Sequence, residues 1–236
     1  MRTLLPIVLA AIVAGCGGGS DEESQSLPTG SQTVELDAAD FSAEVDHAYW
    51  PMAPGNQWVY EEDGQRVEVT VTDRTRTIDG IEARVVHDVV TEDGQVVEDT
   101  FDWYARDRDG NVWYLGEDTT EFEDGKPVSK EGSWEHGVGG AQGGILLPAH
   151  PEPGQAYRQE YYAGHAEDRA KVLSVDQPVT VPYGRFDRSL MTEDSTPLEP
   201  DATERKYYVR DVGPVLAVSV ANGGREELVS FETRGP

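Results

Sequence analysis

The fold is decided by the stretch Val67-Glu68-Val69-Thr70-Val71-Thr72, in which valines alternate with polar residues. Successive side chains of a β-strand point to opposite faces of the sheet, so the alternation puts the valines on one face and the polar groups on the other. Residues 81–90 carry a similar pattern with many β-branched side chains. These residues therefore predict strands that bury one face only.

Turn signals recur at short intervals on both sides of this stretch. Each is an Asp-Gly or Asn-Gly pair, a sequence that adopts the positive φ of tight hairpin turns: Asp63-Gly64, Asp79-Gly80, Asp93-Gly94, Asp109-Gly110, Asp124-Gly125 and Asn222-Gly223. The spacing predicts strands at 56–62, 65–75, 81–92, 95–106, 111–118, 120–123, 126–132, 155–162, 166–175, 186–194, 204–210, 214–221 and 225–232.

These strands form an antiparallel meander of about the length of one domain. Exposed strand edges pair with other chains, so a sheet of this size has to close or fold over. We therefore expect an all-β fold in which the meander forms a curved sheet, a half-barrel or a barrel. Residues 37–48 are the only stretch compatible with a helix.

The meander is interrupted by residues 133–154, where several glycines precede Ile145-Leu146-Leu147-Pro148. Loops of this length are often functional or mobile. The apolar triplet has to be buried, either as a plug at the end of a barrel or as a mobile lid over a cavity. We favour the plug.

Residues 1–15 have the features of an export signal. Arg2 lies beside the amino terminus, and an apolar run extends from Leu4 to Ala14. This run is shorter than the ~20 apolar residues that span a membrane. The segment ends in Val13-Ala14-Gly15-Cys16, which resembles the lipobox of bacterial lipoproteins. The resemblance implies cleavage before Cys16 and transfer of a diacylglycerol to its thiol.

Cys16 is the only cysteine of the chain, so no disulfide forms within the chain. An ordinary secretory signal is the alternative, but it leaves the lone thiol without a role. Residues 16–40 then comprise the lipidated cysteine and a flexible tether of low apolar content. We expect a single β domain over residues 41–236, anchored outside the cytoplasm to a lipid bilayer of the cell envelope through acylated Cys16.

The chain is strongly acidic, with 45 acidic residues against 19 Lys and Arg and a formal net charge of −26. Such a surface repels phosphate backbones, which argues against nucleic-acid binding. It also repels anionic lipid headgroups, so membrane attachment depends on the lipid rather than on a basic patch.

The segment Tyr49-Trp50-Pro51-Met52-Ala53-Pro54-Gly55-Asn56-Gln57-Trp58-Val59-Tyr60 resembles the opening of an uncharacterised family of bacterial exported lipoproteins. Members begin with aromatic-Pro-x-x-x-Gly-x-x-Trp-x-Tyr before a run of β-hairpins. Residues 102–118, 132–135 and 157–162 look like later parts of the same family. The resemblance covers most of residues 41–232 and implies an exported β domain, but no activity.

Adjacent aromatic pairs are the most unusual feature, and three of them are candidate ligand-binding residues. Neighbouring residues on a strand point to opposite faces, so each pair places one ring inside and one outside. Outer rings could stack on a sugar or cover an apolar ligand, whereas packing within the sheet is the alternative role. The candidates are Trp103, Tyr104, Trp113, Tyr114, Tyr161 and Tyr162.

Four residues follow the spacing of an EF-hand calcium loop, namely Asp107, Asp109, Asn111 and Asp118. Val112 stands where that loop requires glycine, and the last ligand is Asp rather than Glu. An ordinary hairpin turn explains the same residues, so calcium is a candidate cofactor that a titration would test.

Other chemistry has little support in the sequence. His136, His150 and His165 lie in or near the long loop and would form a metal site only by clustering in space. No Gly-x-Ser-x-Gly, Ser-x-x-Lys or phosphate-binding loop is present. Paired carboxylates carry no information in a chain with so many acids.

We therefore expect a non-enzymatic envelope lipoprotein whose β domain binds a hydrophobic or carbohydrate ligand, or a partner protein. The alternative is a structural or interaction module of an envelope assembly that uses its outer aromatic rings as an interface. A hydrolase of envelope glycans or lipids comes third, and it would need an acid of perturbed pKa in a cleft.

Overall fold

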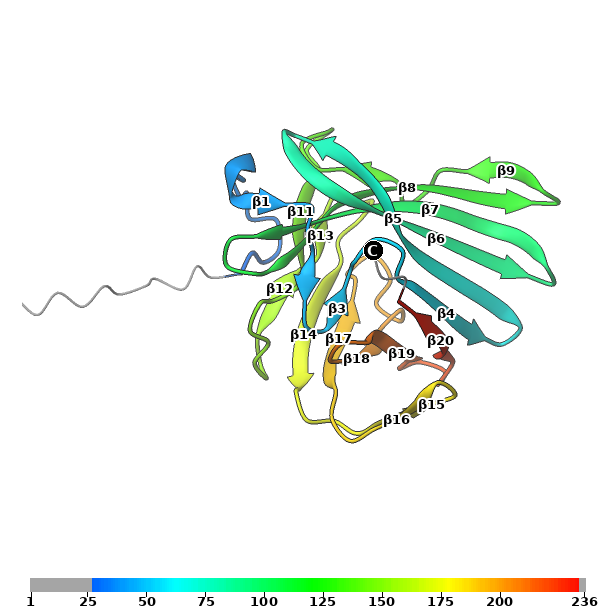
Figure 1. Ribbon diagram of the computed structural model, residues 1–236. Helices are drawn as coiled ribbons and strands as arrows, with labels where there is room; N and C mark the ends of the chain where they lie inside the picture. The colour runs from blue at the N-terminus through cyan, green and yellow to red at the C-terminus, as the bar shows by residue number, and fades with distance from the viewer. Residues whose placement is uncertain (1–26, 234–236) are drawn as a thin grey trace, which may run out of the picture.

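The alternating stretch forms the longest hairpins of the protein. In the computed structural model, which describes residues 27–233, they comprise β5 (Gln65–Ile78), β6 (Ile81–Glu92), β7 (Gln95–Asp107) and β8 (Val112–Glu123) (Figure 1). The turns before β5, between β5 and β6 and between β6 and β7 each have an Asp at positive φ followed by Gly, namely Asp63-Gly64, Asp79-Gly80 and Asp93-Gly94, as these pairs predict.

A 16-stranded antiparallel sheet contains these hairpins. The path through it follows the order β12 (Ala156–Arg158), β14 (Arg169–Ser174), β17 (Leu190–Ser195), β18 (Glu204–Val209), β19 (Gly213–Ser219), β20 (Arg225–Glu232), β4 (Gln57–Glu62), β5, β6, β7, β8, β11 (Gln142–Leu147) and β13 (Glu160–Tyr161). Off this path, β1 (Phe41–Ser42) pairs with β7, while β9 (Lys126–Ser129) and β10 (Trp134–Glu135) pair with β8.

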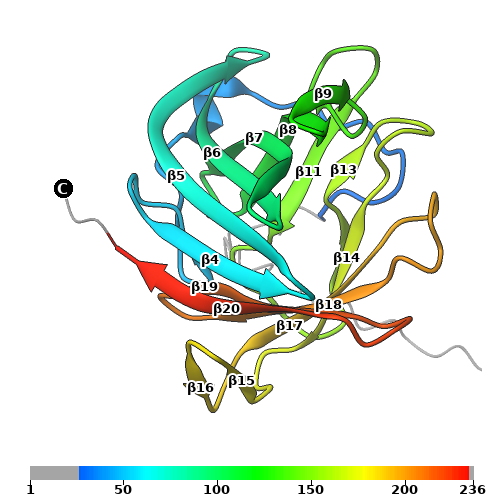
Figure 2. The ribbon, with the colours of Figure 1, turned by 90° about the vertical axis from the view of Figure 1, so that its right-hand side faces the viewer.

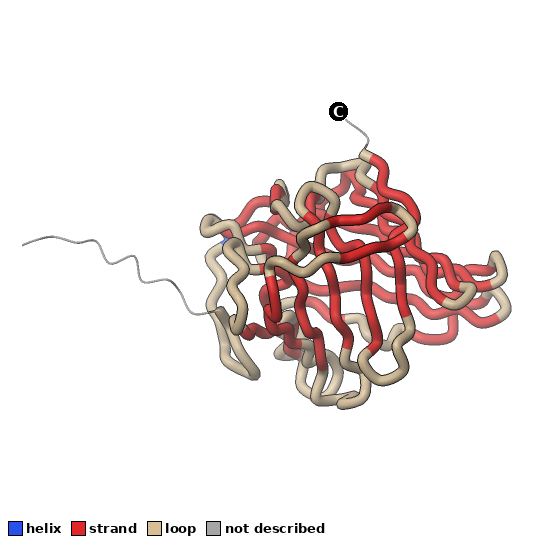
Figure 3. The backbone as a smooth tube through the Cα atoms, turned by 90° about the horizontal axis from the view of Figure 1, so that it is seen from below, coloured by secondary structure: helices blue, strands red, loops and turns tan. Residues whose placement is uncertain are grey.

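The sheet curls into a nearly closed barrel (Figure 2). Its two terminal strands, β12 and β13, are separated along the chain by Gln159 alone. Arg158 donates to the Gly143 carbonyl on β11 over 3.0 Å, so the two ends are joined by side-chain contacts. Seen from below, the strands run side by side and the loops gather at their ends (Figure 3). The expectation of an all-β curved sheet or barrel is confirmed.

Two small sheets flank the barrel and were not expected from the sequence. They consist of β2 (Asp46–His47) with β3 (Trp50–Pro51), and of β15 (Val179–Val181) with β16 (Gly184–Phe186). Within the expected helical stretch 37–48, only Ala38–Asp40 is helical, as a short 3-10 turn. No helix within residues 27–233 is long and apolar enough to span a membrane.

The apolar triplet of the long loop is a strand of the wall rather than a plug or a lid. Ile145 and Leu147 in β11 are fully buried and pair with β8. A side chain on Gly143 would come within 2.7 Å of the Tyr114 carbonyl, and one on Gly144 would overlap the backbone at Arg158. The glycines therefore allow close backbone approach at the closure of the barrel, and they hide the alternation that would have predicted a strand.

The packed part of the chain begins earlier than the expected boundary at residue 41. Leu27, Val34 and Leu36 pack against the core. Arg158 donates to the carbonyls of Gly30 over 2.9 Å and Gln32 over 2.6 Å. Residues 27–40 are thus held against the barrel by a buried guanidinium that their composition does not reveal. The rest of the predicted tether lies outside the described residues.

The Trp-x-Tyr end of the opening motif has a structural role. Trp58 and Tyr60 are two residues apart on β4, so both side chains point into the barrel. The Trp58 indole donates to the Val212 carbonyl over 2.6 Å, and the Tyr60 hydroxyl donates to the Pro214 carbonyl over 3.0 Å. The pair fastens β4 to the start of β19, two strands away in the sheet.

Candidate functional site

A cavity of about 320 Å³ lies inside the barrel. Its walls come from β4 to β8 on one side and from β18 to β20 on the other, with contributions from β3, β11 and β13. This volume is at the lower end of the range for small-molecule sites, ~300–1,000 Å³. The inner face of the barrel is therefore not filled by its own side chains.

Aromatic rings form one part of the lining. The rings of Tyr104 and Tyr114 stack with their centroids 4.9 Å apart. Trp50 lies 5.5 Å from Tyr104 and 6.5 Å from Tyr208, which joins rings from three strands. Tyr60 adds a fifth ring. These faces give the cavity flat, polarisable surfaces against which a ligand can pack.

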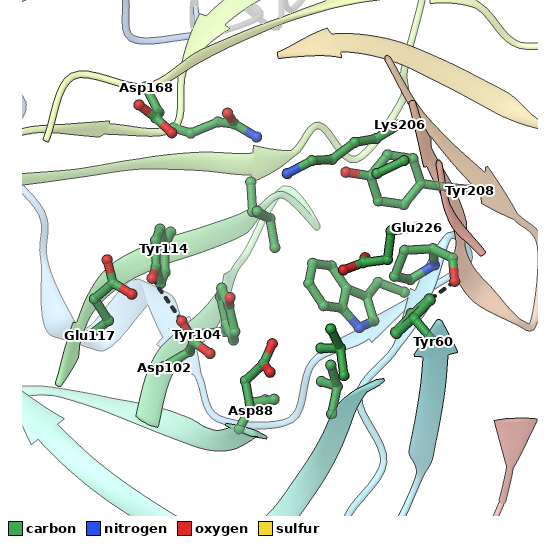
Figure 4. A pocket seen from close by; sticks show the side chains of 18 of the residues that line it. Tyr60, Asp88, Asp102, Tyr104, Tyr114, Glu117, Asp168, Lys206, Tyr208 and Glu226 are labelled. Atoms are coloured by element: carbon green, nitrogen blue, oxygen red, sulfur yellow. Dashed lines mark hydrogen bonds between the residues drawn. The ribbon is translucent and has the colours of Figure 1, made fainter. Parts of the chain in front are cut away.

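Carboxyl groups form the other part of the lining. They belong to Asp88, Asp102, Glu117, Glu160, Asp168 and Glu226. Asp102 and Glu117 are direct cross-strand partners, and Asp88 is the diagonal neighbour of Asp102. Figure 4 shows Asp88 and Asp102 on one wall, with Glu226 and Lys206 reaching into the pocket from the other.

Burial shifts the acid–base behaviour of these carboxyl groups, because a charged carboxylate is poorly solvated inside the barrel. Burial raises the pKa of Asp102 to about 6, although the hydroxyl of Tyr114 opposes the shift. Burial and the charge of Asp102 raise the pKa of Glu117 to about 8. Burial likewise raises the pKa of Glu226 to about 7. Carboxyl groups with these values change protonation near neutral pH.

Lys206 is the one cationic side chain of the lining. Burial alone would lower its pKa, but the charges of the surrounding carboxylates outweigh burial and raise the pKa. Its ammonium lies 3.6 Å from a carboxylate oxygen of Asp194 and 3.8 Å from one of Glu204. Lys206 is therefore charged and already paired with two acids that do not line the cavity.

In the two predicted pairs on β7 and β8, the two rings of each pair lie on opposite faces of the sheet, as expected for neighbours on a strand. Tyr104 and Tyr114 line the cavity. Trp103 lies on the other face, where the guanidinium of Arg76 stands 4.0 Å over its ring. Trp113 also lies there, against Phe41. Both outer rings are buried by these neighbours, which favours a packing role for them.

Tyr161 and Tyr162 lie apart from the cavity lining. Tyr162 stacks on His165 with the ring centroids 4.6 Å apart. Tyr104 and Tyr114 therefore lie inside the barrel, Trp103 and Trp113 lie on its outer face, and the Tyr161-Tyr162 pair lies elsewhere. The three pairs do not form one shared binding surface.

The four residues of the candidate calcium loop are not brought together around one point. Both oxygens of the Asp107 carboxylate accept hydrogen bonds, from Asn111 and from the Trp113 indole. Asp118 is the cross-strand partner of Phe101, six positions along β7 from Asp107, and it pairs with Lys130. These contacts are those of a hairpin turn.

The loop histidines take part in separate contacts. Nδ1 of His136 accepts from the Gly143 amide over 2.9 Å, His150 lines a second cleft beside Arg188 and Arg210, and His165 stacks as described. Within residues 27–233 no group of three or more His, Cys, Asp or Glu side chains is arranged to hold a metal ion. Cys16 lies outside the described residues.

The carboxyl lining was missed by the sequence interpretation. Its members come from strands that lie far apart in the chain, and acids are so frequent that none stands out. A signal did exist on β7, where Asp102 and Tyr104 occupy alternate positions between buried neighbours. Burying a carboxyl group on the inward face of a strand costs free energy, so an acid at such a position indicates a functional role.

Comparisons with known proteins give little more. No known protein family matches the chain, and no curated protein matches it either. Among solved structures, the chain aligns with a protein from Parabacteroides distasonis described as a putative lipoprotein, with a TM-score of 0.39 and 12% sequence identity. The similarity covers 79% of this chain and 99% of that chain.

Proposed function

We propose that the protein is a lipid-anchored protein of the bacterial cell envelope whose barrel binds a small ligand in its central cavity without transforming it. The observation that supports this most directly is the cavity of about 320 Å³ lined by stacked rings and buried carboxyl groups. A barrel that serves only as scaffold would be expected to fill this space with apolar side chains.

The anchor rests on the amino-terminal sequence. Val13-Ala14-Gly15-Cys16 has the form of a lipobox, and the opening motif around Trp58 resembles that of exported lipoproteins. Residues 17–26 lie between Cys16 and Leu27, the first described residue, which packs against the core. The barrel would thus be tethered outside the cytoplasm, close to a membrane surface.

The lining favours a polar ligand over a purely hydrophobic one. Six carboxyl groups and an ammonium group would lose water against an apolar molecule without gaining hydrogen bonds. A ligand that offers both hydrogen-bond donors and flat faces, as a carbohydrate does, fits rings and carboxyl groups together. We therefore retain the glycan class and set aside the hydrophobic class.

Hydrolysis of a glycan is a second candidate, because two neighbouring carboxyl groups of the lining have raised pKa values. Asp102 and Glu117 face each other across β7 and β8, and burial raises the pKa of both. Two carboxyl groups of different pKa on a sugar site are the usual acid and base of glycosidases. Release of reducing ends from envelope glycans, abolished in Glu117→Gln, would favour this candidate over simple binding.

Native mass spectrometry tests the binding proposal. The chain from Gly17 onward, which contains every described residue, is exported and compared in native and denatured form. We expect additional mass of a few hundred daltons that is lost on denaturation. Ala217→Trp, which places a large ring into the cavity lining, should remove that mass.

The matched control is Val220→Trp, which adds the same ring at a surface turn. It should retain the additional mass. Equal native and denatured masses in the parent protein would contradict the proposal and shift weight to the envelope-assembly alternative.

A further inference from the structure

The acidic and basic side chains that line the cavity do not balance in number. Six carboxyl groups face one ammonium group, that of Lys206, and this ammonium is already paired with Asp194 and Glu204 outside the lining. Burial raises the pKa of Glu226 and Asp168, and the Lys206 charge opposes that rise without forming an ion pair with either carboxyl group. Among residues 27–233, no Lys, Arg or His side chain forms an ion pair with any of the six carboxyl groups. Buried acids are usually paired within their own protein.

One of these carboxyl groups, that of Asp88, also has a buried oxygen, Oδ1, with no hydrogen-bond partner in the described part of the chain. Glu160, which is 8% exposed, differs because burial raises its pKa and the Trp134 indole supplies a donor that opposes this rise. A buried acceptor without a donor costs about 1–3 kcal/mol, so Oδ1 of Asp88 in the cavity wall is explained most simply by a donor on the ligand.

The carboxyl groups are spread over two walls rather than gathered at one point. Asp88, Asp102 and Glu117 lie on β6, β7 and β8, whereas Glu226 lies on β20 across the pocket (Figure 4). No group of three or more potential ligands in residues 27–233 is arranged to hold a metal ion. This distribution fits an elongated cation with separated charges better than a single ion.

The aromatic rings supply a second contact that cations prefer. The rings of Tyr104, Tyr114 and Trp50 line the same cavity as the carboxyl groups. Ammonium groups are attracted to the faces of aromatic rings by ~0.5–2 kcal/mol, more strongly when they are desolvated. Aromatic rings and carboxyl groups without a cationic partner are the two features that recognise organic amines, and both line this cavity.

Resting on the proposed function, we infer that the ligand is a small organic cation with two or more amino groups, bound between the unpaired carboxyl groups of the two walls. One ammonium group would lie against Asp88, Asp102 and Glu117, and the other against Glu226. The methylene chain between them would pack on the aromatic rings. Amino sugars and aliphatic diamines share this chemistry.

The experiment compares three six-carbon probes by isothermal titration calorimetry on the full-length protein in neutral detergent at pH 8. The probes are 1,6-diaminohexane, 1-aminohexane and 1,6-hexanediol, which match in length and differ in charge. We expect the diamine to bind about tenfold or more tightly than the monoamine, because the second ammonium meets its own carboxylate. The diol should show no measurable binding.

Two pairs of variants separate the cavity from the acidic surface, which attracts any cation. Glu226→Gln and Glu117→Gln should each weaken diamine binding at least about fivefold. Glu227→Gln and Glu121→Gln remove the same charge from the same two strands at positions outside the cavity lining. These controls should change affinity less than about twofold, since Glu121 is exposed and the charge of Glu227 is already paired with Arg225.

A proton count gives an independent readout. A bound ammonium stabilises ionised carboxylates, so carboxyl groups that are protonated in the free protein lose their protons on binding. Because burial raises the pKa of Glu117 to about 8 and of Glu226 to about 7, diamine binding at pH 7 should release protons. Titrations in buffers of different ionisation enthalpy measure that release.

Diol binding as tight as diamine binding, or equal losses in the cavity variants and their controls, would overturn the inference. These results are distinguishable from failure of the proposed function. If a retained native ligand has no amino group, the inference fails and the binding function stands. If the protein retains no ligand and no probe binds, both fail.

Discussion

The hydroxyl of Tyr114 donates a 2.7 Å hydrogen bond to Oδ1 of Asp102 inside the barrel. This bond stabilises the ionised carboxylate and limits the rise in the pKa of Asp102, which burial takes to about 6. Tyr114→Phe removes the hydroxyl and keeps the ring. We expect a higher pKa of Asp102, measured by ¹³C NMR of the carboxyl carbon, whereas Tyr162→Phe should leave it unchanged. An unaltered titration in Tyr114→Phe would show that the bond does not form in solution.

Glu117 should make stability depend on pH. Burial and the Asp102 charge raise its pKa from 4.5 to about 8, so the folded state binds the proton more tightly than the unfolded state. The stabilisation is fully present below pH 4.5 and is lost as the pH rises through about 8. We expect the melting temperature to fall between pH 5 and pH 8, and to fall less in Glu117→Gln than in the exposed control Glu121→Gln. Parallel curves for the two variants would contradict this assignment.

Arg158 should hold the amino-terminal segment on the barrel. Its guanidinium donates to the carbonyls of Gly30, Gln32 and Gly143. Arg158→Met leaves these acceptors without a donor, and we expect a loss of about 2–4 kcal/mol in the free energy of unfolding. Urea denaturation measures the loss, and hydrogen exchange should rise in residues 27–36. Arg169→Met, at a largely exposed position on β14, should change stability by less than about 0.5 kcal/mol.

The two faces of β7 should respond differently to loss of an aromatic ring. Tyr104→Leu removes a ring that lines the cavity, and it should weaken diamine binding at least about threefold. Trp103→Leu removes a ring covered by Arg76 on the opposite face, so it should lower stability and leave affinity within about twofold. Calorimetric titration of both folded variants measures the two affinities. A larger loss of affinity in Trp103→Leu than in Tyr104→Leu would place the ligand site on the outer face of the sheet.

Anchoring should depend on Cys16 alone. Cys16→Ser removes the thiol that takes the lipid, so the protein should move from the membrane fraction to the released fraction after cell disruption. Metabolic labelling with a tagged fatty acid should mark the parent protein and not the variant. A Cys16→Ser protein that stays on the membrane would show that another part of the chain attaches it.

The architecture was largely predictable from local patterns. Alternating valines and turn pairs of Asp-Gly or Asn-Gly predicted β5, β6 and β20 to within three residues at each end, with the Asn222-Gly223 turn marking the start of β20. The strand β11 was not predicted because Gly143 and Gly144 occupy its first half, where they allow close contact with the backbone at Tyr114 and Arg158. The packing of residues 27–40 escaped because it depends on the buried side chain of Arg158.

The site was less predictable than the fold. The pairs Trp103-Tyr104 and Trp113-Tyr114 were recognised as unusual. Which ring of each pair points into the barrel could not be predicted, because it depends on which face of the sheet curls inward. The carboxyl lining is assembled from strands as far apart as β6 and β20. A property shared by residues more than a hundred positions apart leaves no local pattern in the sequence.

The most direct test of a ligand-binding barrel is the crystal structure of the protein purified from its own cell envelope without denaturation. The account predicts electron density for a small molecule in the cavity, in contact with the rings of Tyr104 and Tyr114 and extending toward Glu226. Density for water alone, or a cavity filled by rearranged side chains, would contradict it.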